Sequence, residues 1–403
     1  MTPSGRHGPL TGVRVVELGN FIAAPTAGRV LAEFGGDVIK VERPSTGDEL
    51  RTWRLHRGDT SLLFRTMARN KRSLTLDLRA AEGQRIARDL IGTADVVLEN
   101  FRPGTLEKWG LGPEEIRALH PSVVLVRISG YGQTGPYRNR PGFGGVAEAL
   151  GGVRHLTGYP GLPPVRTGVS LADSVAGLYA VIGALLGLLR ARAGASGETV
   201  DVALYEAVYS LMESSLPDYD AFGVTREATG AVIPGVVPSN TYRCADGKYV
   251  VVGGNNNAIF TRLMTAVGRP DLAADPELAD NAGRVARAAD IDEAIGAWTA
   301  GLDSAAALDR LAAASVPSGP IYDVADIAAD PHFAARGMLE RHPVRIDDEP
   351  REVAFPGVVP KLAEEPGGTR WLGPELGAHT DEVLAELHRT PADITRLRAE
   401  GVI

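Results

Sequence analysis

The chain has 403 residues, of which 44% are hydrophobic and 23% are charged, proportions typical of a globular protein rather than of a disordered or membrane-resident one. This length exceeds what one hydrophobic core usually serves, so two domains or one large interrupted domain are expected. The formal net charge of -8 argues against a nucleic-acid partner held by general electrostatic attraction.

Residue counts and patterns narrow the class further. Cys244 is the only cysteine, so neither an intrachain disulfide nor a cysteine metal cluster can form, and the eight histidines include no H-E-x-x-H pair. No N-terminal segment has the pattern of a secretory signal, and the longest apolar run, residues 175–189, is shorter than the roughly 20 residues that span a bilayer. We therefore expect a cytoplasmic protein with no metal and no membrane partner, whose apolar run is a buried helix.

Short apolar runs alternate with helical patterns along the first third of the chain. This rhythm is typical of an α/β fold with a parallel sheet, in which functional residues gather in the loops beyond the carboxyl ends of the strands. Strands are predicted at 13–18, 37–41, 73–78, 95–98 and 123–128, and helices at 25–34, 81–93, 106–111 and 113–119. The loops concerned are 19–25, 42–48, 99–104 and 129–136.

Several common nucleotide and hydrolase motifs are missing. Residues 19–24 follow the first predicted strand, where a dinucleotide-binding fold carries G-x-G-x-x-G, but they lack the second and third glycines. Neither G-x-x-x-x-G-K-[ST] nor G-x-S-x-G occurs. A nicotinamide-dependent oxidoreductase, a P-loop NTPase and a serine hydrolase are therefore disfavoured.

Basic side chains lie close to the predicted strand ends. On a chain that is acidic overall, they either line a groove for one polyphosphorylated ligand or form a solvated rim, and composition alone does not decide between the two. They are Arg43, Lys71, Arg72, Arg79, Arg102, Lys108, Arg138 and Arg140.

Asp173 lies between a glycine- and proline-rich segment and the apolar helical run. A carboxylate in this place can act as a covalent nucleophile if a closed site removes it from water. The alternative interpretation is that Asp173 caps the helix, because aspartate is a favoured N-cap residue.

Five sequence segments around these residues resemble the family III CoA-transferases. This group includes formyl-CoA, carnitine and succinyl-CoA-dependent transferases and is related to the 2-methylacyl-CoA racemases. The segments are LTGVRVVELG at 10–19, FGGDVIKVERP at 34–44, NKRSLTLDL at 70–78, ADVVLENFRPG at 94–104 and SGYGQTGPY at 129–137. The resemblance continues through 242–248 and 377–382 and so runs nearly end to end.

The resemblance implies a role for Asp173. In that family the nucleophile is an aspartate at the end of a G-x-x-x-x-D step, and Gly168 to Asp173 match this step. The implied reaction passes through an aspartyl anhydride and an aspartyl-CoA thioester, and it requires no ATP, metal or permanently bound cofactor, because coenzyme A enters as part of the acyl-CoA substrate. The site must keep water from the anhydrides, and backbone N–H groups of a glycine-containing loop are expected to stabilise the oxyanions.

The resemblance also implies contacts with coenzyme A. The matching positions are Ile22, Ala23, Arg43, Leu76, Arg79, Asn100, Phe101, Arg102, Lys108 and Arg140, with Arg43 expected beside the adenine. Lys108 stands where formyl-CoA transferase has an arginine. Pro141 stands where that enzyme has a basic residue, and the resemblance leaves open whether the adjacent Arg140 replaces it. Ile22 occupies the place of a glutamine near the reacting carbonyl, which disfavours formate as the donor acid.

The same fold allows two alternative functions. The racemases use a histidine and a glutamate to move a proton, and the corresponding positions here are Phe143 and Asn256, neither of which can act as a general base. A catalytically silent acyl-CoA-binding protein is the other alternative, and reaction at Asp173 would distinguish it from a transferase.

The resemblance predicts a Rossmann-like large domain, a smaller α/β domain and an interlocked homodimer. The expected large domain comprises residues 1–220 and 325–403, and the smaller domain comprises 226–324, with a strand at 249–252 and helices at 258–267, 291–302 and 305–314. Residues 230–240 are either a mobile lid over the site or an interdomain linker.

The segments 143–152 and 234–242 look similar to those of transferases that move coenzyme A from succinyl-CoA to a dicarboxylic or hydroxy acid. Such an acceptor needs a cation for its second carboxylate, and Arg154, His155 and Arg166 are candidates that could equally be surface groups. The resulting hypothesis is an enzyme with an acyl-CoA donor and a carboxylic acid acceptor.

Overall fold

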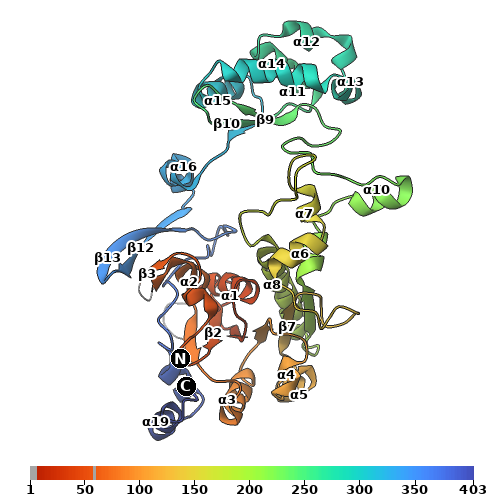
Figure 1. Cartoon of the computed structure of the whole chain (residues 1–403). Coiled ribbons are helices and arrows are strands. Elements are labelled where there is room, and N and C mark those ends of the chain that lie inside the picture. The colour runs from red at the N-terminus through yellow and green to blue at the C-terminus, as the bar shows by residue number, and fades with distance from the viewer. Residues whose placement is uncertain (1–6, 58–59) are drawn as a thin grey trace. The chain divides into compact units, whose positions relative to one another are not determined.

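A computed structural model of the chain describes residues 7–57 and 60–403, which form two compact units (Figure 1). The larger unit comprises the chain up to Val153, Arg166–Gly223 and Ala334–Ile403, and the smaller unit comprises Arg154–Val165 and Val224–Phe333. Residues 154–165 and 325–333, which were expected in the large domain, thus cluster with the smaller unit. Residues 1–6 of the expected large domain lie outside the described residues.

The larger unit is built on a six-stranded parallel sheet with the strand order β5-β2-β1-β6-β7-β8. Its strands are β1 (Arg14–Glu17), β2 (Asp37–Glu42), β5 (Arg72–Thr75), β6 (Val96–Glu99), β7 (Val124–Ser129) and β8 (Thr199–Ala203). Val16 pairs with Ile39 of β2 on one side and with Val97 of β6 on the other. The predicted α/β class and parallel sheet are confirmed.

Both faces of this sheet are buried, because successive residues of a strand point to opposite sides and each side meets a layer of helices. Val15 belongs to a core shared with α1 (Ala23–Glu33) and α8 (Leu171–Arg192), whereas Val16 belongs to a core shared with α3, α5, α18 and α19. The latter helices are α3 (Ala81–Ile91), α5 (Pro113–Leu119), α18 (Thr380–Glu386) and α19 (Pro391–Ala399). The C-terminal segment, blue in Figure 1, therefore completes the core of the unit that the N-terminal strands begin.

Helix α8 is longer and less buried than the sequence suggested. It has 22 residues, and its small residues pack tightly, since a Cβ on Gly187 would lie 2.6 Å from a methyl group of Val124 in β7. The opposite face exposes large apolar side chains, namely Leu178, Tyr179, Ile182, Leu185, Leu186 and Leu189. By length and composition alone this helix could cross a membrane, but one such helix is weak evidence, and here its small-residue face lies on the sheet.

The smaller unit packs helices against an antiparallel sheet of order β11-β10-β9. The strands are β9 (Ser239–Arg243), β10 (Tyr249–Gly253) and β11 (Ser318–Pro320). The helices are α11 (Asn257–Ala266), α12 (Pro270–Ala274), α13 (Asn281–Ala286), α14 (Ala288–Ala300), α15 (Ser304–Ala313) and α16 (Val324–Ala329), with α7 (Val153–Leu156) and α17 (Pro331–Ala335) at the unit boundaries.

Shorter elements complete the larger unit. They are α2 (Leu62–Met67), α4 (Thr105–Lys108), α6 (Gly144–Leu150), α9 (Leu204–Tyr209), α10 (Ser215–Phe222), the strand pairs β3 (His56–Arg57) with β4 (Thr60–Ser61) and β12 (Leu339–Ile346) with β13 (Glu349–Pro356), and a 3-10 turn at Glu49–Arg51. Of these, α6 bears most directly on the candidate site, because it packs against both α8 and α9.

Candidate active site

Asp173 occupies the third position of α8, after the N-cap residue Ser170. The capping interpretation is therefore wrong: the helix begins before Asp173, whose carboxylate is available for another role. Its position in the first turn is electrostatically favourable, since helix N-termini carry partial positive charge.

The half-buried Asp173 carboxylate lines a pocket of about 250 Å³. The other walls come from the loops after β1, β6 and β7 and from the segment before α6, so the pocket lies beyond the carboxyl ends of the central strands. Three cations share this pocket with Asp173, namely Arg102, Arg138 and Arg140, and all three are solvent-exposed. The pocket thus combines one recessed carboxylate with a cationic mouth.

The carboxylate of Asp173 lies directly against the backbone of Gly144, the first residue of α6. A Cβ at Gly144 would lie 2.0 Å from Oδ2 of Asp173 and 2.8 Å from its carboxyl carbon, which is closer than Cβ atoms approach non-bonded neighbours, so one of the two groups would have to shift. Glycine is therefore the residue that leaves room for the nucleophile in this position.

Burial and, as a smaller effect, the negative charge of Glu148 together raise the pKa of Asp173 to about 6, against the opposing effect of Arg166. Glu148 is a buried residue of α6, and its Oε2 lies 3.9 Å from Nε of Arg166. At neutral pH most of Asp173 is ionised and thus nucleophilic, yet it is less well stabilised than an ordinary exposed carboxylate.

A second cavity, of about 150 Å³, adjoins the first and shares Asn20 and Phe101 with it. It contains Arg43, whose Nη2 donates to Oε1 of Glu49 at 2.6 Å, and Arg79, which pairs with Asp77 at 3.0 Å. Phe101 contacts Trp109 edge to face in its wall. The two cavities are thus neighbours: the first contains the Asp173 carboxylate, and the second is a recess with aromatic and arginine side chains.

The structure brings most of the predicted coenzyme A contacts to these two cavities. The first is lined by Ala23, Asn100, Phe101, Arg102 and Arg140, and the second by Arg43, Leu76, Arg79 and Phe101. Ile22 and Lys108 line neither cavity among the described residues, although both lie in flanking segments.

Lys71 and Arg72 lie neither in the groove nor on a solvated rim. Both are buried: Nζ of Lys71 donates to Oε2 of Glu17 at 2.7 Å, and Arg72 binds Asp37 at 2.7 Å and Glu386 at 2.6 Å. Both interpretations offered for these two residues were therefore wrong, because their acidic partners come from distant parts of the chain.

Asn20 and Asn100 hold the wall between the two cavities. The backbone N–H of Asn20 donates to Oδ1 of Asn100 at 2.9 Å, and Nδ2 of Asn100 donates to the carbonyl of Asn20 at 2.7 Å. The side chain of Asn100 thus joins the loop after β1 to the loop after β6. The sequence analysis missed Asn20, Gly144 and Glu148 as site residues.

A buried ion cluster contacts the loop after β1, which forms part of the same wall. Nζ of Lys40 lies 2.7 Å from Oδ2 of Asp48 and 2.9 Å from Oε1 of Glu17, and it also donates to the carbonyl of Gly19. Oδ1 of Asp48 accepts from the backbone N–H of Phe21, a residue held at a φ of 62° that side chains rarely adopt. Although burial alone would lower the pKa of Lys40, Asp48 and Glu17 raise it above its ordinary value.

Replacing Lys40 by methionine is expected to lower the free energy of unfolding by about 3–5 kcal/mol, because the buried carboxylates of Asp48 and Glu17 lose a shared cation. Urea unfolding followed by circular dichroism measures this. Replacing Arg190, which forms an exposed pair with Glu198, by methionine is the control and should cost less than about 1 kcal/mol. Equal effects of the two substitutions would contradict the assignment.

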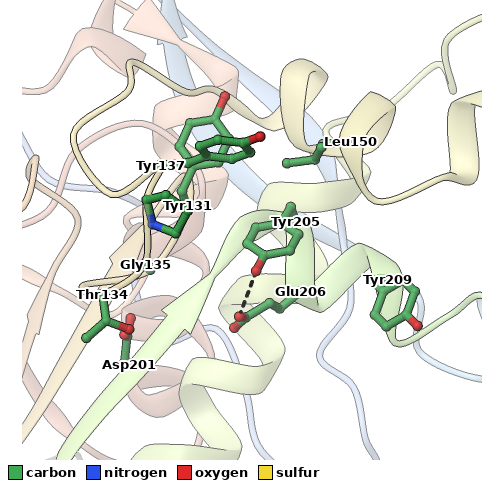
Figure 2. A pocket seen from close by; sticks show the side chains of 11 residues that line it. Tyr131, Thr134, Gly135, Tyr137, Leu150, Asp201, Tyr205, Glu206 and Tyr209 are labelled. Carbon is green, nitrogen blue, oxygen red and sulfur yellow. Dashed lines mark hydrogen bonds between the residues drawn. The ribbon is translucent and has the colours of Figure 1, made fainter.

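Another cavity, of about 430 Å³, has a different character (Figure 2). Tyr131, Tyr137 and Tyr205 gather around it with Asp201 and Glu206, and the hydroxyl of Tyr205 donates to Glu206. Its acidic side chains would repel phosphates, and it contains none of the predicted site residues. The smaller pair of cavities is therefore the better candidate for a phosphorylated ligand.

A recessed aspartate beside an arginine-lined groove, at the carboxyl edge of a parallel sheet, is an arrangement suited to an α/β enzyme that binds a phosphorylated substrate next to a carboxylate. The family model described as CoA-transferase family III matches residues 10–380, and the chain belongs to this family. The predicted family is thus confirmed.

Relatives agree with this assignment. The chain is 46% identical to succinyl-CoA–D-citramalate CoA-transferase and 43% identical to the beta subunit of succinyl-CoA–L-malate CoA-transferase, both from Chloroflexus aurantiacus, and each match covers 98% of both chains. A crystal structure of a CaiB/BaiF family protein from Brucella suis superposes with a TM-score of 0.81 at 35% identity and covers 95% of this chain and 100% of the other. The chain is therefore a CoA-transferase that uses an acyl-CoA donor and a carboxylate acceptor. Neither an oxidoreductase nor a silent binding protein describes it.

Proposed function

We propose that the enzyme transfers coenzyme A from succinyl-CoA to a dicarboxylic or hydroxy acid, with Asp173 as the covalent nucleophile. The observation that carries this proposal is the position of Asp173, recessed in a pocket whose mouth holds three arginines. The names of the two Chloroflexus relatives support the choice of donor and of acceptor class.

In the proposed reaction a carboxylate oxygen of Asp173 attacks the thioester carbonyl, and the sulfur leaves with its electron pair as the CoA thiolate. The thiolate then attacks the aspartyl carbonyl of the anhydride, releases the donor acid and leaves an aspartyl-CoA thioester. The acceptor carboxylate attacks this thioester to form a second anhydride, and the returning thiolate yields the new acyl-CoA and free Asp173. Each step exchanges one bond for another of similar kind, so no external energy source is needed.

The two cavities suit different parts of coenzyme A. We place the thioester and the pantetheine arm in the first cavity, the phosphates at its exposed arginines, Arg102, Arg138 and Arg140, and the adenosine in the second cavity, beside Arg43. Guanidinium groups suit both places, because they pair with phosphate oxygens and stack on planar rings. Arg140 already lies over the Tyr137 ring, with its guanidinium carbon 3.7 Å from the ring centroid.

Arg166 is our candidate for the second carboxylate of the acceptor. It precedes α8 in the larger unit, influences Asp173 electrostatically, and leaves 53% of its side chain exposed to an incoming acid. The other two candidates belong to the smaller unit, where Nε2 of His155 lies 3.1 Å from Glu227.

Replacing Arg166 by methionine is expected to raise KM for a dicarboxylate acceptor about 10- to 100-fold, because a charge-assisted hydrogen bond is lost. KM for a monocarboxylate such as acetate should change by less than about threefold. Steady-state assays with both acids measure the split, and Arg166→Lys should restore part of the affinity. An equal rise in KM for both acids would show that Arg166 does not bind the second carboxylate.

The proposed assembly is a homodimer in which the exposed apolar face of α8 is covered by the partner. Isolated apolar side chains are ordinary on surfaces, but six on one helix face form a patch of the kind that marks an interface. The interlocked arrangement expected from the family would provide this cover.

Light scattering coupled to gel filtration is expected to give twice the chain mass of 42.5 kDa. Leu186→Glu, which places a charge in the patch, should shift the species to the monomer mass, whereas Leu119→Glu on α5, against the opposite sheet face, should not. A wild-type protein of monomer mass would refute the proposed dimer.

A panel of carboxylic acids incubated with succinyl-CoA, followed by mass spectrometry of the CoA products, tests the proposed function. We expect transfer to dicarboxylic or hydroxy acids. Transfer to none of them would refute the acceptor class, and failure of every acyl-CoA donor to acylate the protein would refute the covalent mechanism.

A further inference from the structure

Helix α6 turns two residues toward the nucleophile. Gly144 and Glu148 are four residues apart and therefore lie on the same face of the helix. Gly144 contacts the carboxylate of Asp173, and Glu148 is buried one turn further along. A buried carboxylate next to a second one costs the folded protein free energy, so its presence at the nucleophile calls for an explanation.

The charges around the pair are unequally distributed. Arg166 lies on the side of Glu148, with Nε 3.9 Å from Oε2, and it opposes the effect of Glu148 on Asp173. The arginines that line the pocket lie where coenzyme A would bind; they are Arg102, Arg138 and Arg140. The titratable residues of α9, which also packs against α6, line the other cavity instead (Figure 2); they are Tyr205, Glu206 and Tyr209. On α8 itself, the hydroxyl of Tyr179 is hydrogen-bonded to that of Ser210.

We propose that Glu148 is a positioning residue that drives acylation of Asp173 by placing a buried negative charge behind it. This proposal rests on the proposed function of Asp173 as the covalent nucleophile. Glu148 itself forms no bond to the substrate and exchanges no proton with it.

The charge flow of the reaction gives the physical reason. When an oxygen of Asp173 bonds to the thioester carbonyl carbon, the carbon–sulfur bond breaks and its electron pair leaves with the sulfur. One negative charge therefore moves from Asp173 to the CoA thiolate, and the atoms and electrons balance without a proton. Repulsion between Glu148 and ionised Asp173 exists before this step and is relieved after it, so the rate of acylation increases.

In the second half-reaction, too, the repulsion between Glu148 and Asp173 is absent while Asp173 is acylated. When the acceptor carboxylate attacks the aspartyl-CoA thioester, Asp173 remains neutral within an anhydride, and its charge returns only when the thiolate removes the acyl group. Glu148 therefore disfavours the free carboxylate at every stage and shifts the resting distribution toward acylated enzyme. The Gly144 contact fixes the position of the Asp173 carboxylate against the helix that carries Glu148.

The test measures the acylation of Asp173 in the full-length protein with succinyl-CoA as the probe, by rapid quench and mass spectrometry from about pH 5 to 8. Wild-type acylation should fall as the pH drops through about 6, where burial and Glu148 place the pKa of Asp173. Glu148→Gln, which keeps the shape and removes the charge, should slow acylation at pH 8 about tenfold and move the fall to lower pH.

Substitution of Arg166 supplies a test of opposite sign. Arg166→Met removes the positive charge and should move the fall in acylation to higher pH, whereas Glu148→Asp should remain close to wild type. Glu206→Gln on α9 is the matched control and should leave the profile in place. If Glu148→Gln does not fold, Glu148→Met, which removes the charge with an apolar side chain of similar size, should give the same movement to lower pH, and an unchanged profile for that variant would overturn the role of Glu148.

The outcomes separate the two proposals. Absence of an adduct on wild-type Asp173 would refute the proposed function, and this inference with it. Normal wild-type acylation with an unchanged profile for Glu148→Gln, or with shifts of the same direction for Glu148→Gln and Arg166→Met, would overturn the role of Glu148 alone.

Discussion

Replacement of Asp173 by alanine is expected to lower the rate of CoA transfer by at least about 10⁴-fold, because no other group can form the acyl intermediates. The pocket holds no second carboxylate among its lining residues, and Glu148 is buried behind the nucleophile rather than in the cavity wall. Transfer assays with succinyl-CoA, and mass spectrometry for a hydroxylamine-sensitive adduct, measure the loss. Retention of even a few per cent of activity would contradict the nucleophilic role.

Asp173→Asn controls for folding and adds a stability measurement. Because the pKa of Asp173 in the folded protein, about 6, lies above the ordinary 3.8, ionisation costs the folded state free energy once the pH exceeds the unfolded value, and this cost is complete above about pH 6. The full shift corresponds to about 3 kcal/mol, which partial exposure reduces to roughly 1–2 kcal/mol. The asparagine variant should therefore be more stable than wild type at pH 7 but not at pH 4, while remaining inactive.

The sheet was largely predictable because parallel strands are buried on both faces and thus appear as unbroken apolar runs. Five of the six strands of the large sheet overlap predicted ones. The sixth, β8, escaped because it has the sequence TVDVA, in which polar residues at 199 and 201 interrupt the apolar pattern at the sheet edge. Strand order and the return of the C-terminal helices depend on long-range packing, which the pattern of one sequence does not encode locally.

The site was predictable where a residue type and a motif coincide, as at Asp173 and Arg43. It was not predictable where function depends on a neighbour distant in sequence. Lys71 looked like a groove cation because its partner, Glu17, lies 54 residues away. Glu148 carried one usable signal, an acidic residue within the short apolar helix 144–150, whereas the importance of Gly144 follows only from the approach of α8.

That approach makes Gly144 the most constrained backbone position of the site. The carboxyl carbon of Asp173 would lie 2.8 Å from a Cβ at residue 144, and both atoms belong to helices that pack against each other. The backbone of α6 cannot retreat freely, because the same helix packs against α9 on another side. A methyl group at this position must therefore displace the Asp173 side chain, which has rotatable bonds, rather than either helix.

Gly144→Ala is accordingly expected to lower kcat at least about 100-fold while the fold persists, because a displacement of about 1 Å removes the carboxylate from the line of attack. Transfer assays and the rate of adduct formation measure the loss, and far-ultraviolet circular dichroism checks the fold. Gly296→Ala in α14 makes the same substitution at a helical glycine with open space around it, and activity should be unchanged. If Gly144→Ala kept wild-type kcat, Asp173 could react from a different rotamer, and the packed carboxylate would not be the reactive conformation.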